Sequence, residues 1–354
     1  PQLMKAAILS ELFDQSDDFG EILVHTGQHY DPNMSSNLLG ELCFRAPDYQ
    51  LECGGVDELK MLSEMIVGIA DIIEKESPDV VISYGDTTTT LAGALAARKS
   101  NIVHVHVEAG VRNFDMRMPE EVNRVIVDRI SDLNFCATER GVRNLIRESA
   151  FSGSKGSHLF SGDLMLDCFI KYSMQVTPLV DALLPINTID EEYVYVTCHR
   201  KSNVDDRRQL GEIVEALNEI NSNIRVILPL HPRTKRRLEE FKLNLSFQSV
   251  PPVSYSESLG LIRRASTVIT DSGGVVREAF FAKKPSVFLL EDPVWPEIED
   301  VGCSVSTPQI TSGSILRQYE LSKTLQGNFE EPIFGDGGAG LKIVAAIREY
   351  LTYK

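Results

Sequence analysis

A regular alternation of short apolar segments with longer amphipathic ones constrains the fold of this sequence more than any other feature. The short segments have the length and apolar character of buried strands, and they are residues 21–25, 79–83, 102–107, 133–136, 193–197, 225–228, 267–269 and 286–290. Helical periodicity lies between them, as at Leu59, Leu62, Ile66, Ile69 and Ile73. Short apolar strands that alternate with helices are typical of parallel sheets covered on both faces. The sequence therefore predicts an α/β protein.

The alternation runs twice, which predicts two doubly wound domains. A chain of 354 residues is long for a single core. The pattern restarts after about residue 171, and residues 177–190 contain prolines without periodicity, as a linker region does. We therefore expect an N-terminal domain over residues 1–170 and a C-terminal domain over residues 171–337. A last predicted helix, at about residues 338–354, is expected to pack back on the first domain.

The composition excludes several classes of protein. The formal net charge of −16 argues against nucleic-acid binding, which needs a basic surface. No apolar run approaches the roughly 18 residues that span a bilayer, and no basic-then-apolar leader opens the chain. The six cysteines include no Cys-x-x-Cys pair, which indicates reduced structural thiols. We expect a cytoplasmic protein that binds neither nucleic acid nor membrane.

One predicted strand-to-helix turn, the sequence TDSGGVVREA at residues 270–279, is a candidate anion site. Ligands of open α/β sheets bind at the carboxyl ends of the strands. Several backbone N–H groups meet at a helix N-terminus here, and two glycines let a phosphate approach the backbone closely. An ordinary turn with an N-cap residue explains the same stretch equally well. From these residues alone, both interpretations stand.

Acidic residues lie at three corresponding places in the first half. Asp86 comes soon after the strand at 79–83, where it serves a ligand unless it, or one of the threonines that follow it, only caps the next helix. Glu108 ends the next strand, and Glu120 opens a helix that begins with Pro119, where the helix dipole stabilises acids. Clustered carboxylates perturb one another and can divide into a proton donor and a proton acceptor.

His104 and His106 are predicted to share one face of their strand with Glu108, because side chains alternate along a strand. Imidazole and carboxylate groups suit zinc or iron, so the spacing invites a metal site. A full site needs further ligands, however, and a histidine in a buried strand is more often a hydrogen-bonded core residue. We therefore expect no metal here.

Basic residues follow two strands of the second half, at His199, Arg200 and Lys201 and again at His231 and Arg233. Either loop could be a solvated basic patch, but two of them on an acidic chain indicate an anionic ligand. Acidic loops in one domain and basic loops in the other suggest a cleft between the domains. Such a cleft would hold a phosphate-bearing ligand on one wall and move protons on the other.

Eight short segments, in order along nearly the whole chain, match the pattern of a known family. They are HTGQHY at 25–30, YGDTTT at 84–89, HVEAGVR at 106–112, MPEEVNR at 118–124, HR at 199–200, HPRT at 231–234, TDSGG at 270–274 and GDG at 335–337. On these segments the sequence resembles the non-hydrolysing UDP-N-acetylglucosamine 2-epimerases of bacteria and archaea. The resemblance implies two Rossmann-like domains in a glycosyltransferase B-type arrangement, with the active site in the interdomain cleft.

The resemblance also implies a reaction. The family interconverts UDP-GlcNAc and UDP-ManNAc by inversion at C-2. UDP leaves by anti-elimination, a 2-acetamidoglucal forms, and UDP adds back. This chemistry needs paired acids rather than a cofactor, so no cofactor is expected. The family further implies a homodimer and a role in supplying surface-polysaccharide precursors.

Site residues follow from the resemblance by position. The residues that match catalytic positions are Asp86, Glu108, Glu120 and His199, and we expect Asp86 and Glu120 to transfer protons. The residues that match substrate-binding positions are Lys5, Arg124, Arg200, His231, Ser272, Gly273, Gly274 and Glu278. Of these, Glu278 is expected to bind the ribose hydroxyls. Gln28 and His29 resemble residues that line a second, regulatory nucleotide-sugar site.

Three departures separate this sequence from the usual family pattern. The family's first strand and its Gly-Thr-Arg-Pro-Glu segment would precede Pro1, so the arginine of that segment is expected to be absent. Leu290 stands where the family has an arginine, and residues 199–203 read HRKSN in place of HRREN.

Gln2 and Trp295 are similar to residues of a branch that acts on UDP-2,3-diacetamido-2,3-dideoxy-glucuronate. That sugar is the nearest alternative substrate. A hydrolysing 2-epimerase, a glycosyltransferase of the same fold and an inactive nucleotide-sugar sensor are further alternatives.

Overall fold

The computed structural model describes residues 2–28, 44–55, 57–152, 156–174 and 192–353. The chain divides into two compact units, of which the first contains Pro1–Cys168 and Pro332–Lys354 and the second contains Phe169–Glu331. Each unit is built on parallel strands with helices between them, so the predicted α/β class is confirmed. The linker predicted at residues 177–190 lies outside the described residues.

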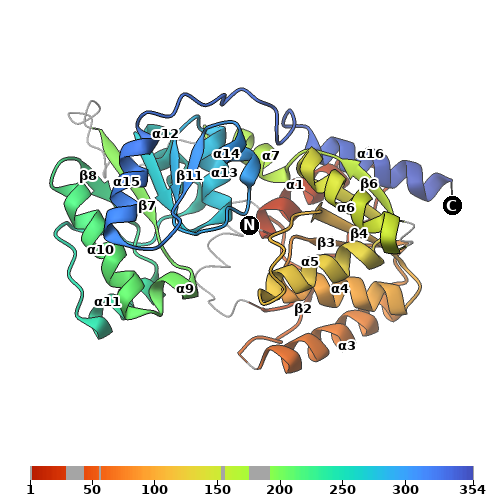
Figure 1. The fold of residues 1–354 in the computed structure, drawn as a ribbon. Coiled ribbons are helices and arrows are strands. Elements are labelled where there is room, and N and C mark those ends of the chain that lie inside the picture. The colour runs from red at the N-terminus through yellow and green to blue at the C-terminus, as the bar shows by residue number, and fades with distance from the viewer. Residues whose placement is uncertain (1, 29–43, 56, 153–155, 175–191, 354) are drawn as a thin grey trace. The chain divides into compact units, whose positions relative to one another are not determined.

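The first unit contains a parallel sheet with the strand order β3-β4-β5-β6. Its strands are β3 (Val80–Tyr84), β4 (Val103–Ala109), β5 (Leu133–Cys136) and β6 (Ser157–Phe160). Its helices are α1 (Gln2–Asp14), α3 (Glu58–Glu76), α4 (Thr88–Lys99), α5 (Pro119–Ile130), α6 (Glu139–Ser152) and α16 (Ala339–Thr352), while α7 (Leu164–Tyr172) runs across the boundary between the units. Helix α16 lies beside α1, so the two ends of the chain complete the same unit (Figure 1).

Helices α3 and α4 show how the sequence forms this unit. Met65, Ile69 and Ile73 recur every fourth residue on α3, and they pack against the small side chains Ala92 and Ala96 of α4. Small residues on α4 let the two helices approach closely. The apolar stripe that the sequence shows is therefore the face that α3 buries.

The second unit contains a parallel sheet with the strand order β11-β10-β9-β7-β8. Its strands are β7 (Tyr193–Thr197), β8 (Arg225–Ile227), β9 (Thr267–Thr270), β10 (Ser286–Phe288) and β11 (Ser304–Ser306). Its helices are α9 (Lys201–Val204), α10 (Arg207–Asn221), α11 (Pro232–Phe241), α12 (Tyr255–Arg264), α13 (Gly273–Phe281), α14 (Pro296–Asp300) and α15 (Ser312–Ser322). Val194 and Val196 face a core with α10 and α15, whereas Tyr193 and Tyr195 face a core with α12 and α13. Both faces of this sheet are thus covered.

The structure departs from the predicted elements at the sheet edges. Strands β6 and β11 do not stand out in the sequence because edge strands are not buried on both faces and need no continuous apolar run. The strand predicted at residues 21–25 is reduced to β1 (Val24–His25), which pairs with β2 (Tyr49–Gln50). Strand pairing does not extend to Leu23, whose N–H donates to the Asp48 carboxylate at 2.7 Å.

Candidate functional site

Glu108 forms a β-bulge near the carboxyl end of β4. It is the extra residue between two consecutive pairs that β4 makes with β5. Its φ of 75° lies in the left-handed region, which residues with a side chain rarely adopt. The alternation along β4 therefore holds for His104 and His106 but breaks at Glu108. Backbone strain of this kind persists where the surroundings hold the chain in place, and it is common at functional sites.

A buried lysine binds the Glu108 carboxylate. Lys5 Nζ of α1 lies 2.6 Å from Glu108 Oε2, and the lysine side chain is 0% exposed whereas that of Glu108 is 12% exposed. Lys5 also donates to Gln2 Oε1 at 3.0 Å. The Gln2 amide lies directly against Gly85, where an added Cβ would overlap it. Helix α1 therefore contacts the carboxyl ends of both β3 and β4.

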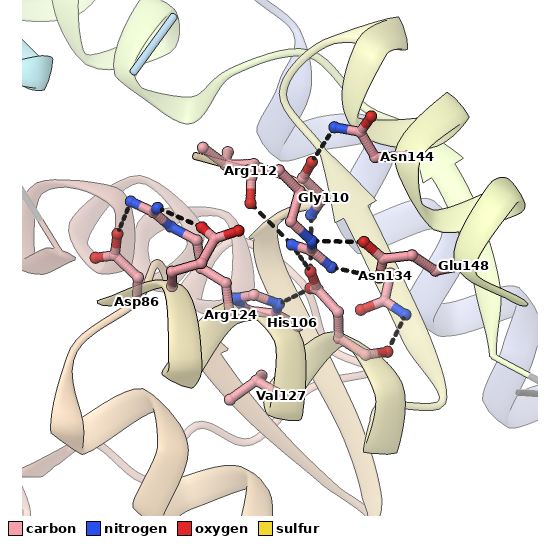
Figure 2. Close-up of polar contacts among 12 residues, drawn as sticks. Asp86, His106, Gly110, Arg112, Arg124, Val127, Asn134, Asn144 and Glu148 are labelled. Carbon is pink, nitrogen blue, oxygen red and sulfur yellow. Dashed lines mark hydrogen bonds and ion pairs between the residues drawn. The ribbon is translucent and has the colours of Figure 1, made fainter. Parts of the chain in front are cut away.

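Asp86, which follows Gly85 after β3, binds a cation of its own. Arg124 of α5 forms an ion pair with the Asp86 carboxylate, as Figure 2 shows. Asn123 donates to the Asp86 carbonyl oxygen at 2.9 Å. Of the residues predicted as possible caps of this helix, the threonine is confirmed, because Thr87 is the N-cap of α4, and Asp86 is not the cap. The Asp86 carboxylate pairs with Arg124 instead of capping α4.

Glu121, one residue beyond the predicted Glu120, is the buried acid of this region. Its carboxylate accepts from the backbone N–H groups of Asn113 and Phe114, both at 3.0 Å, and from Arg124 at 3.1 Å. Glu120 lies exposed in the first turn of α5. Burial lowers the pKa of Arg124, but the charges of Asp86 and Glu121 outweigh burial and raise it. Glu121 thus holds both the loop before α5 and the cation that binds Asp86.

A second network of buried charges lies next to these loops. Asp128 of α5 accepts from His106 Nδ1 and from Arg112 Nη1, both at 2.6 Å. Arg112 also donates twice to Glu148 of α6 at 2.8 Å, as Figure 2 shows. Burial raises the pKa of Asp128, but the charges of His106 and Arg112 outweigh it and hold that pKa below its ordinary value. No pattern in the sequence analysis singled out Asp128 or Glu148.

In the second unit, a buried aspartate organises the loop that carries His199. Asp271 is 0% exposed and accepts from the backbone N–H groups of His199 at 2.9 Å and Arg200 at 2.8 Å. The Asn203 side chain donates to the same carboxylate at 3.2 Å. His199 Nδ1 lies 3.3 Å from Asp271 Oδ1, while its side chain is 42% exposed. One buried carboxylate therefore fixes the backbone of the basic loop through hydrogen bonds.

The turn after β9 begins α13 with Ser272 as the N-cap, and the Ser272 hydroxyl accepts from Val275 N–H at 3.3 Å. Trp295 Nε1 donates to the Gly273 carbonyl oxygen at 3.0 Å. A Cβ added at Gly273 or Gly274 would meet no atom closer than 3.6 Å. Packing within the described part of the chain therefore does not require a glycine at either position. This favours the interpretation that the two glycines allow a ligand to approach the backbone closely.

The remaining candidates of the second unit lie on neighbouring elements. His231 is the N-cap of α11, where its Nδ1 accepts from Arg233 N–H at 3.2 Å. The ring centroids of His231 and His199 are 5.8 Å apart. Glu278, on the second turn of α13, is buried. The structure thus brings the two basic loops together at the carboxyl edge of this sheet.

Comparison with known proteins decides the family. The family described as UDP-N-acetylglucosamine 2-epimerase matches residues 11–348 of this chain. The protein is a member of the UDP-N-acetylglucosamine 2-epimerase family. The predicted family resemblance is therefore confirmed.

Individual epimerases are similar over nearly the full length. The UDP-2,3-diacetamido-2,3-dideoxy-D-glucuronate 2-epimerase of Pseudomonas aeruginosa is 40% identical over 355 residues, which cover 99% of this chain and 97% of that protein. The UDP-N-acetylglucosamine 2-epimerase of Methanocaldococcus jannaschii is 36% identical over 343 residues, or 94% of this chain and 91% of that protein. A crystal structure of the latter enzyme, in complex with UDP-GlcNAc and UDP, matches with a TM-score of 0.88 and 34% identity over 100% of this chain and 97% of that chain.

The candidate regulatory residues of this epimerase are only partly described. Gln28 Oε1 accepts from the backbone N–H of Thr89 at 3.0 Å and from its hydroxyl at 2.8 Å. His29 lies outside the described residues. Gln28 therefore joins the segment after β1 to the first turn of α4.

The histidines of β4 are core residues in this epimerase. His104 Nδ1 lies 2.8 Å from Ser131 Oγ and Nε2 lies 3.0 Å from Ser83 Oγ. Burial is the main cause that lowers the pKa of His104 to about 3. Within the described ranges, no cluster of three or more His, Cys, Asp or Glu residues has the arrangement of a metal site. No helix in the same ranges is long and apolar enough to cross a membrane.

Proposed function

We propose that this epimerase inverts C-2 of a UDP-linked 2-acetamido sugar through elimination and re-addition of UDP. The observation that carries the proposal is the pair of carboxylates Asp86 and Glu108, each bound to a buried cation. Strands β3 and β4 pair in register up to Tyr84 and Val107, so the residues that follow them emerge at one edge of the sheet. Two acids at one edge, held in fixed directions, are what proton transfer at a carbon centre requires.

The proposed reaction has two steps that mirror each other. In the first, a base removes the C-2 proton, a double bond forms between C-1 and C-2, and the C-1–O bond breaks with its electron pair leaving on UDP. In the second, a proton adds to the opposite face of C-2 and the UDP oxygen bonds to C-1 again. Asp86 and Glu120 are the proposed proton-transfer groups, with Glu108 and His199 assisting the departure and return of UDP.

The second unit is the proposed binding site for UDP. The N-terminus of α13 presents the backbone N–H groups of Gly273 and Gly274 beside the hydroxyl of Ser272, and the helix dipole favours a diphosphate there. Arg200 and His231 are the proposed cationic contacts to the same diphosphate. The proposed partner of the ribose hydroxyls is the carboxylate of Glu278.

Two substrates are candidates. UDP-GlcNAc is supported by the family description and by the M. jannaschii relative. UDP-2,3-diacetamido-2,3-dideoxy-D-glucuronate is supported by the Pseudomonas relative, which has 40% rather than 36% identity. Gln2 and Trp295, which resemble residues of that branch, contact Lys5 and Gly273 at the candidate sites. We favour the diacetamido sugar for this reason.

Incubation in heavy water tests the proposal. Each UDP-sugar is incubated separately with the full chain and followed by proton NMR. The proposal expects deuterium at C-2 and the appearance of the C-2 epimer, faster with the diacetamido sugar. Free sugar together with UDP would indicate a hydrolysing enzyme. Absence of C-2 exchange with both substrates would overturn the proposed reaction.

A further inference from the structure

His106 lies between two hydrogen-bond acceptors in the interior of the first unit. Its side chain is fully buried, its Nε2 lies 2.7 Å from the Gly85 carbonyl oxygen, and its Nδ1 lies 2.6 Å from Asp128 Oδ1. A carbonyl oxygen and an ionised carboxylate accept hydrogen bonds but donate none. Asp128 Oδ2 also accepts from the Arg112 guanidinium and from the Gly110 N–H, so Asp128 is the ionised partner. Both nitrogens of His106 must therefore donate, which makes the ring an imidazolium.

His104 shows that burial alone does not produce this state. It lies two residues earlier on β4 and is equally buried, but its ring nitrogens meet the hydroxyls of Ser131 and Ser83. A hydroxyl can donate or accept, so a neutral imidazole satisfies both bonds. The hydrogen-bond partners of each ring, rather than its burial, determine that His104 is neutral and that His106 is charged.

The bond from His106 fixes the residue that precedes Asp86. Gly85 has a φ of 67°, and its N–H donates to the Val107 carbonyl oxygen at 2.9 Å. With its own carbonyl oxygen bound by His106 Nε2, Gly85 is held on both sides of its α-carbon. The direction in which Asp86 leaves β3 is therefore set by β4.

Asp128 extends the same control to the other carboxylate. Its Oδ2 accepts from Gly110 N–H at 3.1 Å, two residues after Glu108. Asn144 of α6 donates to the Gly110 carbonyl oxygen at 2.9 Å, and Figure 2 shows Asn144 and Arg112 on either side of this peptide. Gly110 itself has a φ of 78°. The bulge at Glu108 is thus held by side chains from α5 and α6.

We propose that His106 is a positioning residue for the chemistry at C-2: as an imidazolium it binds the Gly85 carbonyl and the Asp128 carboxylate, and so sets the directions of Asp86 and Glu108. This inference rests on the proposed function, in which Asp86 transfers a proton and Glu108 assists the departure and return of UDP. Breaking a buried, charged hydrogen-bonded pair is costly, so the arrangement is stiff. A neutral side chain with one donor cannot replace it.

Nitrogen NMR of the histidine ring tests the charge without any substrate. Because both of its partners are acceptors, wild-type His106 should show two protonated ring nitrogens. In Asp128→Asn, the amide can donate to Nδ1, so the ring should become a neutral tautomer protonated only on Nε2. A neutral His106 in the wild-type protein would overturn the proposal. This result does not depend on which reaction the protein catalyses.

Kinetics test the positioning role. Glutamine can donate to one partner but not to both, so His106→Gln should lower kcat about 10- to 100-fold while KM stays within about twofold, because misplaced reacting groups cost rate rather than binding. His104→Gln is the matched control on the same strand, and it should retain kcat. Should His106→Gln fail to fold, His106→Asn replaces it: its shorter amide can stay near Asp128 but does not reach the Gly85 carbonyl, so the same loss of kcat is expected.

Three outcomes separate the possible failures. Wild-type kcat in the His106→Gln or His106→Asn variant would overturn the positioning role, as would an equal loss in His104→Gln. If the wild-type protein epimerises neither UDP-sugar, the proposed function fails and the positioning role at C-2 fails with it. The nitrogen NMR result would then still decide the charge of His106.

Discussion

The two units place their charges in opposite ways at the carboxyl ends of similar parallel sheets. In the first unit the cations are buried and the acids face outward, since Lys5 and Arg124 are 0% and 8% exposed under Glu108 and Asp86 at 12% and 21%. In the second unit the acid is buried and the base faces outward, with Asp271 at 0% under His199 at 42%. In each case a buried partner sets the direction of the more exposed group.

This inversion shows how one fold serves two kinds of chemistry. An outward carboxylate on a fixed cation can exchange protons with a substrate, whereas an outward imidazole and helix N-terminus attract an anion. The sheet topology does not choose between these uses. The choice lies in which side chains follow each strand and which partner is buried behind them.

The largest expected effect comes from removing the outward acid of the first unit. Asp86→Asn keeps the size of the side chain and one acceptor for Arg124, but it cannot take a proton, so the C-2 exchange rate should fall about 10²- to 10⁴-fold. UDP affinity, measured by calorimetry, should not change. Asp18→Asn, which alters an exposed ion pair with Arg348, is the control. A rate near that of the wild type would remove Asp86 from the mechanism.

A glycine substitution tests the anion site of the second unit. Gly274→Ala should raise the unfolding free energy by up to about 1 kcal/mol, because alanine favours a helix and the added Cβ has room. UDP affinity should nevertheless fall about 10- to 100-fold, which corresponds to about 1.5–3 kcal/mol of lost hydrogen bonds to a charged group.

Gly211→Ala in α10 is the matched control, because its Cβ would meet only Leu243 Cδ2 at 3.8 Å. It should bring a similar gain in stability with no change in UDP binding. Calorimetric titration with UDP and urea denaturation measure both quantities. Unchanged UDP affinity in Gly274→Ala would mean that the turn is only a capped helix start.

The buried acid of the second unit should have a smaller effect on binding. In Asp271→Asn the amide can accept from only one side, so the N–H groups of His199 and Arg200 lose part of their partner at a cost of about 1–3 kcal/mol in stability. We expect UDP affinity to fall by about tenfold because the loop is no longer held. The control is Asp205→Asn, which removes the charge of an ion pair with Arg233 nearer the surface and should leave the UDP affinity unchanged. A Kd for UDP equal to that of the wild type would contradict this role.

The smallest expected effect on activity concerns the neutral histidine of the first unit, which should affect stability instead. Burial lowers the pKa of His104 from its ordinary 6.5 to about 3, so between these values the unfolded chain binds a proton that the folded chain excludes. The resulting stability is complete above pH 6.5 and is lost as the pH falls, at up to about 1.4 kcal/mol per pH unit. In His104→Gln this slope should disappear. Urea denaturation at several pH values measures the unfolding free energy of both proteins. If the unfolding free energies of the wild type and His104→Gln change in parallel with pH, the prediction is wrong.

Local patterns in the sequence were sufficient for much of the fold. Helix α5 at 119–130 and strands β5 and β7 at 133–136 and 193–197 have the predicted bounds, because proline begins the helix and buried parallel strands are continuous apolar runs. The charged stripe at Glu121, Arg124 and Asp128 was visible at helical spacing. Charges at such spacing usually indicate a solvated face, and only the packing of α5 shows that this face points inward.

By itself, the sequence determined most of the alternation of strands and helices, and the family. These follow from periodicity and from short motifs, which are local properties of the chain. The tertiary structure decided which charges are partnered, such as Lys5 with Glu108 and Asp271 with the His199 loop. These partners are far apart in the chain and meet only when helices and strands pack, because electrostatic pairing depends on distance in space rather than along the sequence.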